Sequence, residues 1–199
     1  MQEESIGVGP HPKPWPSSDI YDPQLLAEGD SRNVEDKYRY MSVQAIVDDL
    51  DKTRSGLHIA IENWQNDSNI GTIVRSANAF NVSAVHIIGR RHWNRRGAMV
   101  TDRYLHIFHH STIDDFVSSI GDRKIIAIDN IAGSSPLSSA KLPQQAVLVF
   151  GAEGPGISQD LLAIAGQLIM IEQYGSTRSL NVGVASGIVM YHWTKQYMI

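Results

Sequence analysis

Five short apolar runs alternate with segments of helical periodicity, and this alternation constrains the fold more than any other feature of the chain. The runs are LHIAI (57–61), SAVHIIG (83–89), KIIAID (124–129), AVLVF (146–150) and QLIMI (167–171). Helical patterning begins near Asn69, Thr112, Ser158 and Ser179. Strands that are apolar throughout, instead of at every second residue, are typical of a parallel sheet covered on both faces by helices. The pattern therefore predicts an α/β fold with a mostly parallel sheet and helices on both faces.

The N-terminal segment follows a different pattern. Residues 1–41 hold five of the eight prolines and show no sustained period, which predicts an extended, flexible segment. Ser42 then precedes VQAIVDDL, whose apolar residues recur at helical spacing. We therefore expect a helix to open one domain over residues 42–199.

Composition excludes several classes of protein. No apolar run approaches the roughly 18 residues of a membrane helix, and the acidic start MQEES lacks the layout of a signal peptide, so a cytoplasmic protein with no membrane association is expected. The chain has no cysteine, which excludes disulfides and thiolate ligands. Its histidines, the pair His109 and His110 included, lack the spacing and the carboxylates of a zinc site, so no metal is predicted.

Ligands of open parallel sheets bind beyond the carboxyl ends of the strands, so the loops after Ile61, Asp129, Phe150 and Ile171 are the candidate site. The loop FGAEGPGIS (150–158) matches the glycines and the serine of a phosphate loop, but it has isoleucine where such a loop has lysine. A nucleotide hydrolase is therefore a poor fit. Glu153 repels phosphate and favours hydrogen-bond donors or a cationic cofactor. A plain turn is the alternative.

Two further loops carry polar residues at the start of a helix. In NIGTIVR (69–75), Asn69 can cap the helix, Gly71 allows another backbone to approach, and Arg75 serves either function or packing. The later loop brings Ser179, Leu180 and Asn181 to a helix start, where an ordinary N-cap is the alternative role of Ser179. Small residues at 183, 185 and 187 indicate a close contact of that helix, within the chain or between copies.

A third feature is the arginine segment, residues 90–103. Five arginines face one aspartate there, for a local charge of +4 in a chain of net charge −4; they are Arg90, Arg91, Arg95, Arg96 and Arg103. Together with an aromatic residue, Trp93, such side chains can bind phosphates and stack on an unpaired base. The alternative is a solvated loop with surface ion pairs.

The three loop motifs, in this order and each after a strand, resemble the SpoU (TrmH-like) branch of the SPOUT methyltransferases. The motifs are NIGTIVR (69–75), LVFGAEGPGIS (148–158) and SLNVGVASGIVMYHW (179–193), and the resemblance spans about residues 57–193. It implies a homodimer with a deep C-terminal trefoil knot that uses S-adenosyl-L-methionine to methylate ribose 2'-hydroxyls of RNA. Many ribosomal-RNA members carry a small N-terminal RNA-binding domain, for which residues 1–40 are too short, so transfer RNA is favoured over ribosomal RNA. A catalytically inactive RNA-binding homologue is the alternative.

The resemblance also implies roles for individual residues. Cofactor binding is implied for Asp129, Asn130, Ile131, Gly151, Glu153, Gly154, Ile171, Ser179, Leu180 and Asn181. Arg75 matches the catalytic arginine of the family, with Asn69, Ser179 and Asn181 holding the ribose or phosphate. Because a guanidinium keeps its proton, we expect Arg75 to fix a substrate phosphate and stabilise the developing alkoxide instead of acting as a base. RNA binding then falls to the arginine segment, the N-terminal segment and the partner subunit.

Overall fold

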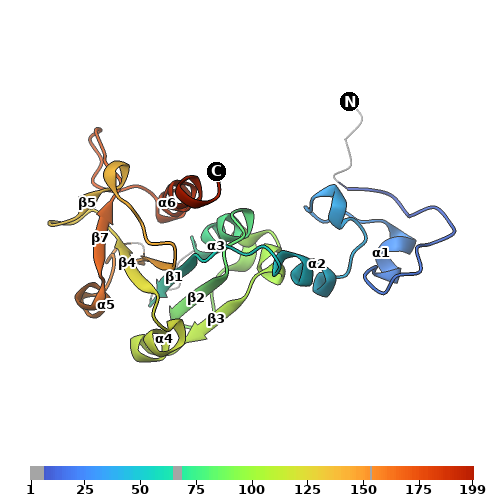
Figure 1. Ribbon diagram of the computed structural model, residues 1–199, viewed down its shortest axis with the longest axis horizontal. Coiled ribbons are helices and arrows are strands. Elements are labelled where there is room, and N and C mark those ends of the chain that lie inside the picture. The colour runs from blue at the N-terminus through green and yellow to red at the C-terminus, as the bar shows by residue number, and fades with distance from the viewer. Residues whose placement is uncertain (1–6, 65–68, 153) are drawn as a thin grey trace. The chain divides into compact units, whose positions relative to one another are not determined.

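The computed structural model describes residues 7–64, 69–152 and 154–199, and its contacts divide the chain into two compact units, Met1–Thr53 and Arg54–Ile199 (Figure 1). The helices are α1 (Pro23–Glu28), α2 (Val43–Leu50), α3 (Ile70–Ala79), α4 (Ile113–Ile120), α5 (Gln159–Ile164) and α6 (Val182–Tyr197). The strands are β1 (His58–Asn63), β2 (Ala84–Gly89), β3 (Ile107–His110), β4 (Lys124–Ile128), β5 (Ser135–Pro136), β6 (Ala146–Phe150) and β7 (Gln167–Met170). Short 3-10 helices include η2 (Arg95–Ala98) and η3 (Thr101–Tyr104).

All seven strands form one parallel sheet in the order β3-β2-β1-β6-β4-β7-β5. Ile59 pairs with Val85 on one side and with Leu148 on the other, so the middle of the sheet is built from the apolar runs. The predicted α/β class with a mostly parallel sheet is thereby confirmed. Because β6 pairs in parallel with β1 on one side and with β4 on the other, the carboxyl ends of these three central strands meet at one edge.

Two hydrophobic cores lie on opposite faces of this sheet. Side chains of α3 and α6, among them Ile73 and Trp193, pack on the face that carries Ile59 and Leu148. Phe116 of α4 and Leu161 of α5 pack on the other face. Figure 1 shows the same arrangement, with α3 and α6 on one side of the strands and α4 and α5 on the other. Every residue of β6 is buried, as a strand covered on both faces requires.

Two edge strands, β3 and β5, lie outside the five apolar runs and were not predicted. β3 has the sequence IFHH with only His110 buried, and β5 is two residues long. An edge strand has a neighbouring strand on one side only and lies at the margin of the sheet, so it needs no continuous apolar run. Three predicted helix starts are correct, since α3, α4 and α5 follow Asn69, Thr112 and Ser158 directly. The last helix begins later than predicted, at Val182, and its N-cap is Asn181 instead of Ser179.

The described part of the N-terminal unit is more structured than the predicted extended segment. Before residue 42 it contains α1, and its buried residues there include Leu26, Asp30 and Tyr38, while α2 follows as the sequence predicted. Asp30 accepts hydrogen bonds from the side chain of Arg32 at 2.7 and 2.9 Å and from the Tyr40 N–H at 2.9 Å. Burial alone would raise the pKa of Asp30, but these hydrogen bonds outweigh it and lower the pKa to about 2. Helix α2 belongs to this unit, so the unit boundary at Thr53 lies beyond the predicted domain start at 42.

Three buried histidines form a hydrogen-bonded row across the sheet under α4. Nδ1 of His58 lies 2.9 Å from Nε2 of His86, and Nδ1 of His86 lies 2.9 Å from Nε2 of His110. Phe116 contacts the rings of His86 and His110 edge-on. Desolvation by burial lowers the pKa of His58 to about 4 and that of His86 to about 3, and it also lowers the pKa of His110. The folded protein therefore holds these imidazoles neutral.

This row predicts a loss of stability in mild acid. In the unfolded chain these histidines have the ordinary pKa of about 6.5 and bind protons below that pH, whereas in the folded chain they do not. Their contribution to stability is therefore fully present above pH 6.5 and falls as the pH drops toward 4. His86 alone would remove about 2 kcal/mol from the free energy of unfolding by pH 5. Urea unfolding of the full chain between pH 7.5 and 4.5 measures this, and His86→Gln should flatten the dependence. A free energy of unfolding that is constant over this range would contradict the prediction.

Candidate ligand pocket at the carboxyl ends of the strands

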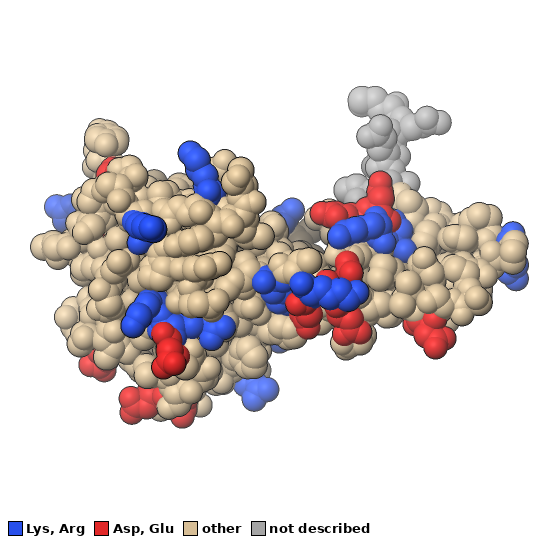
Figure 2. Space-filling model, in the orientation of Figure 1, with Lys and Arg blue, Asp and Glu red and all other residues tan. Residues whose placement is uncertain are grey.

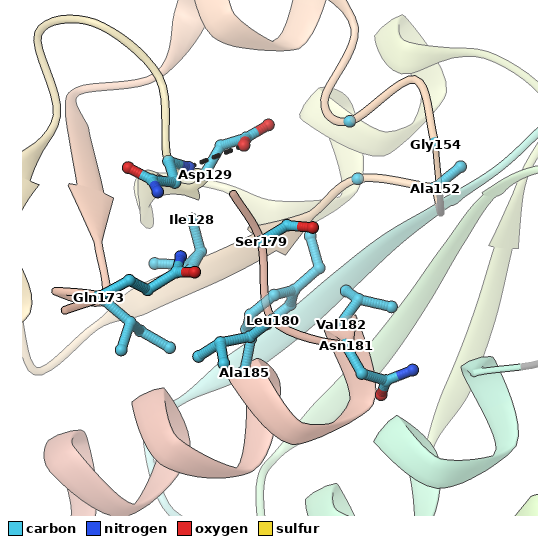
Figure 3. A pocket seen from close by; sticks show the side chains of 15 residues that line it. Ile128, Asp129, Ala152, Gly154, Gln173, Ser179, Leu180, Asn181, Val182 and Ala185 are labelled. Carbon is cyan, nitrogen blue, oxygen red and sulfur yellow. Dashed lines mark hydrogen bonds between the residues drawn. The ribbon is translucent and has the colours of Figure 1, made fainter. Parts of the chain in front are cut away.

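A pocket of about 390 Å³ opens where β4, β6 and β7 end (Figure 3). Its volume falls in the range of small-molecule sites. The lining residues come from the three strand ends, the loops that follow them and the start of α6: Ile128, Asp129, Asn130, Phe150, Gly151, Ala152, Gly154, Gly156, Ile171, Gln173, Ser179, Leu180, Asn181, Val182 and Ala185. The edge and three of the four loops predicted from the sequence thus form one cavity. The first loop, after β1, contributes no residue to the described lining.

The glycine loop after β6 folds back on itself, and its backbone forms one wall of the pocket. Gly156 N–H donates to the Ala152 carbonyl at 3.1 Å. A Cβ at Gly151 would lie 2.1 Å from the carbonyl carbon of Gly156, and Gly156 has a φ of +73°. Both positions therefore require glycine. Glu153, which the sequence singles out in this loop, lies outside the described residues.

Asp129, directly after β4, holds the glycine loop in place. One carboxylate oxygen accepts from the Asn130 N–H at 2.8 Å and the other from the Ile157 N–H at 3.2 Å. Asn130 in turn donates from its side chain to the carbonyl of Arg178, at 3.2 Å, and so connects the β4 loop with the loop before α6. Ile131, predicted to belong to the cofactor site, does not line the pocket, because the chain turns away there with the Ser134 N–H bonded to its carbonyl.

The first and third motifs meet through two asparagine side chains. Asn181 Nδ2 donates to Asn69 Oδ1 at 2.9 Å, while Asn181 Oδ1 caps α6 by accepting from the N–H groups of Gly183 and Val184. Asn69 stands at the N-cap position of α3, but its side chain makes no capping hydrogen bond, in contrast to the expectation from sequence. Its side chain is instead used to join the starts of α3 and α6.

The close contacts predicted for the small residues occur between these helices. A Cβ at Gly183 would lie 3.0 Å from the side chain of Thr72 in α3. Ala185 lines the pocket, and Ser186 is fully buried. The thin side of α6 therefore allows the helix to pack on α3 within one chain.

Arg75 lies in α3 with its side chain exposed. It is not among the described residues that line the pocket, and it makes no hydrogen bond or ion pair to another described residue. The guanidinium is therefore available to a group from outside this set. The structure places Arg75 on the helix that Asn69 and Asn181 connect to the pocket, and not inside the cavity.

The arginine segment packs closely against the start of α3. A Cβ at Gly71 would lie 2.8 Å from the Ala98 nitrogen, which confirms the close backbone approach predicted at this glycine. The side chain of buried Asn63, at the end of β1, donates to the carbonyls of Arg90 and His92 at 2.7 and 3.0 Å. These contacts hold the segment beside the helix that carries Arg75.

The five arginines of this segment differ in their contacts, although all have exposed side chains. Arg95 pairs with Asp102 at 3.3 Å, and its guanidinium lies 5.5 Å from the centroid of the Trp93 ring. For Arg90, Arg91, Arg96 and Arg103 the structure records no ion pair with a described residue. On the face drawn in Figure 2, Lys and Arg side chains stand in several separate groups on mostly uncharged surface.

Sequence patterns did not identify two polar residues that organise this edge. Glu62 of β1 is fully buried; one carboxylate oxygen accepts from the Ser158 N–H at 2.7 Å and the other from Trp64 Nε1 at 2.8 Å. Gln173 lines the pocket beyond β7. A polar residue at the end of an apolar run was the available signal for Glu62, but its partner is far away in the chain.

The chain is an open parallel α/β protein whose strand-end loops enclose a pocket. Proteins of this class bind their ligands at the carboxyl ends of the strands. The model of the SpoU rRNA Methylase family matches residues 56–191, and the chain belongs to this family. The match covers the whole sheet, the pocket lining and most of α6. It does not include the N-terminal unit.

Individual relatives agree with this assignment. The chain is 27% identical over 152 residues to a tRNA (guanosine(18)-2'-O)-methyltransferase of Escherichia coli, with 74% of this chain and 66% of that protein covered. The solved structure of the Aquifex aeolicus TrmH/SpoU tRNA modifying enzyme matches with a TM-score of 0.68 at 25% identity, covering 77% of this chain and 81% of that one. An AdoMet-bound rRNA methyltransferase of Sinorhizobium meliloti matches with a TM-score of 0.65 at 24% identity, covering 75% and 61%. This last likeness supports the fold.

The described helices and side chains also bear on membranes and metals. Among the helices of residues 7–64, 69–152 and 154–199, none is long and apolar enough to cross a bilayer. In the same part of the chain, no group of three or more His, Asp or Glu side chains is arranged so that it could hold a metal ion.

Proposed function

We propose that the chain transfers a methyl group from S-adenosyl-L-methionine to a ribose 2'-hydroxyl of RNA. The observation that carries the proposal is the hydrogen bond between Asn69 and Asn181, which joins the first motif to the third where the latter lines the pocket. It brings the helix of Arg75 to the cavity that would hold the methyl donor. Family membership supports the same reaction.

The residues of the pocket fit this cofactor. The charged side chain of the described lining is the carboxylate of Asp129, which suits a cationic ligand better than a polyphosphate. Apolar walls from Ile171 and Leu180 can contact an adenine ring, and the backbone of Gly154 and Gly156 can approach a ligand closely. When bound, the cofactor would supply a sulfonium-activated methyl group.

The chain's own residues would then align the ribose 2'-hydroxyl with this methyl group. In this proposal, Asn181 and Ser179 position the ribose, and Arg75 holds a phosphate and stabilises the charge that develops on the 2'-oxygen. A substrate phosphate is the group we propose to take the proton, since the guanidinium of Arg75 keeps its own. The deep trefoil knot and the cofactor contact of Glu153 stay predictions from the resemblance.

Transfer RNA is the substrate we favour over ribosomal RNA. The E. coli relative carries the name of a tRNA methyltransferase, and the A. aeolicus structure that of a tRNA modifying enzyme. The arginine segment would bind the phosphates of such a substrate beside α3. Phosphate contacts position an RNA without reading its sequence, whereas unpaired bases are recognised by stacking and hydrogen bonds.

The arginine segment yields a graded prediction for RNA binding. Arg91→Ala and Arg96→Ala should each weaken binding to unrelated RNAs to a similar extent and reduce the slope of log K against log salt by about 1. Arg95→Ala is the matched control, because its guanidinium already pairs with Asp102 and should change binding less. Filter binding of bulk tRNA across a salt series measures the slopes. Equal affinities for all four proteins would assign the segment to an ordinary solvated loop.

A homodimer is proposed from an exposed apolar face of α6. Val184, Ile188 and Tyr191 expose 55%, 39% and 53% of their surface and recur at helical spacing, so they share one side of the helix. The opposite side is buried, with Val189 and Trp193 in the core. A helix that is apolar on both sides is typical of one that is covered on both sides. A second copy of the chain would cover the exposed side.

Replacing Ile188 by glutamate tests this surface. A charge in the centre of an apolar interface is not compensated, so we expect a dimer of the wild-type chain and a monomer of Ile188→Glu. Ile164→Glu is the control, since Ile164 is exposed to 44% on α5, which covers the other face of the sheet. Sedimentation velocity gives the masses. A monomeric wild-type protein, or a dimeric Ile188→Glu, would refute the interface.

Transfer of a radiolabelled methyl group to RNA separates the proposed enzyme from the alternative, an inactive RNA-binding homologue. We expect label in bulk tRNA at ribose 2'-oxygens, and mapping of 2'-O-methyl marks in cells with and without the protein should locate the nucleotide. RNA binding without label would support the alternative. Fractionation of the same cells tests the proposed cytoplasmic location.

A further inference from the structure

One polar atom of the pocket lacks a partner. The side-chain oxygen Oε1 of Gln173 is buried and accepts no hydrogen bond from any described residue. Gln173 also lines the pocket, and Figure 3 shows its amide directed toward the other lining side chains. A buried carbonyl oxygen that has lost its water and gained no donor destabilises the folded state. A ligand that brings a donor to this oxygen would remove that cost.

The chain around Gln173 is held by contacts outside the cavity. The preceding residue, Glu172, accepts hydrogen bonds from the N–H of Ser138 at 3.3 Å and from the Ser138 hydroxyl. These hydrogen bonds lower the pKa of Glu172, so the carboxylate stays ionised and keeps its partners. The backbone that carries Gln173 is therefore anchored to the segment after β5, and the amide can act as a fixed acceptor.

The lining of the pocket indicates which kind of donor suits this oxygen. Ile128, Ile171 and Leu180 are apolar members of the same lining. Gln173 is neutral and brings no counter-charge of its own for an ammonium that loses its hydration, whereas a neutral amine on a flat ring needs only an uncharged acceptor. Both oxygens of Asp129, the charged member of the lining, already accept backbone N–H groups. A neutral aromatic amine is the donor that fits.

We infer that Gln173 recognises the adenine of the adenosyl cofactor, with Oε1 accepting a hydrogen bond from the 6-amino group. Glutamine is suited to adenine because its amide presents an acceptor and a donor side by side. This role rests on the cofactor named in the proposed function and adds to it a residue that determines which nucleoside the pocket accepts. The contact positions the cofactor and takes no part in the methyl transfer.

Calorimetric titration of the full chain with S-adenosylhomocysteine tests the role without any turnover. The second ligand is its analogue with hydrogen in place of the 6-amino group. We expect the wild-type chain to bind the adenine ligand about tenfold more tightly than the analogue. Gln173→Met has nearly the same side-chain volume but no acceptor, and it should bind both ligands with equal affinity. Tyr174→Ala is the control, because Tyr174 is 95% exposed and is not one of the described lining residues.

The outcomes separate this inference from the proposed function. If the wild-type chain binds the two ligands equally, Gln173 does not recognise the amine, whatever Gln173→Met does. If Gln173→Met keeps the tenfold preference for the adenine ligand, another group recognises the 6-amino group. If the wild-type chain binds neither ligand, the cofactor assignment itself fails, and the inference fails with it. Circular dichroism of each variant confirms that a lost preference is not a lost fold.

Discussion

Replacing Arg75 by alanine is expected to stop methyl transfer while cofactor binding continues. Its side chain is exposed on α3, outside the described pocket lining, so its removal leaves the cavity intact. A donor that stabilises charge only in the transition state contributes to the rate and not to ground-state binding, and its loss typically lowers kcat by about a hundredfold to a thousandfold. Turnover of Arg75→Ala should fall by at least this factor, and affinity for S-adenosylhomocysteine should stay within about threefold.

Single-turnover transfer of labelled methyl groups and calorimetry measure the two quantities separately. Arg75→Lys is the informative companion, because it keeps the charge but loses the planar fork of donors that matches a phosphate. We expect it to recover part of the rate. If Arg75→Ala instead lost cofactor binding and kept its rate at saturating cofactor, Arg75 would be a binding residue and the assigned role would be wrong.

The second large effect is expected at Gly151. A Cβ there would lie 2.1 Å from the carbonyl carbon of Gly156 and 2.3 Å from the Ile157 nitrogen. Both are backbone atoms, so a side-chain rotation cannot relieve the clash. Gly151→Ala must therefore displace the glycine loop, which forms one wall of the pocket. We expect affinity for S-adenosylhomocysteine to fall by about a hundredfold or more, with a loss of stability of about 2–4 kcal/mol.

Gly175→Ala is the matched control for this substitution. Gly175 lies in the loop before α6, where a Cβ meets no atom within 4 Å. The same change of residue should leave binding and stability nearly unaltered there. Chemical unfolding and calorimetry of both variants provide the comparison. Unchanged cofactor affinity in Gly151→Ala would show that the loop does not shape the binding site.

Local sequence patterns predicted the parts of this fold that depend on local chemistry. The five apolar runs became β1, β2, β4, β6 and β7, because strands covered on both faces must be apolar along their whole length. The side chains of Thr112 and Ser158 cap the helices that follow them. Each accepts a hydrogen bond from the N–H three residues later, so the contact is local in sequence. Gly71 was recognised as a position of close approach because glycine alone lacks a Cβ.

The motif residues were predicted as a set, but their relations were not. Asp129, Asn130, Ile171 and Leu180 do line one pocket, whereas Ile131 does not, and Arg75 lies outside the described lining. A motif gives residue types at fixed spacing, while the direction of each side chain depends on the turn that follows. At Ile131 the turn closed by Ser134 decided that direction.

The sequence by itself determined the α/β class, the strands that are buried on both faces and the edge of the sheet at which the pocket opens, because each of these follows from the periodicity of apolar residues along a short stretch. Only the tertiary structure decided that Asn181 bonds to Asn69, that Glu62 holds the Ser158 N–H, and that the oxygen of Gln173 is buried without a partner. The first two contacts join residues 112 and 96 positions apart. Burial and pairing of a polar group depend on which distant segments surround it, and no local pattern records that.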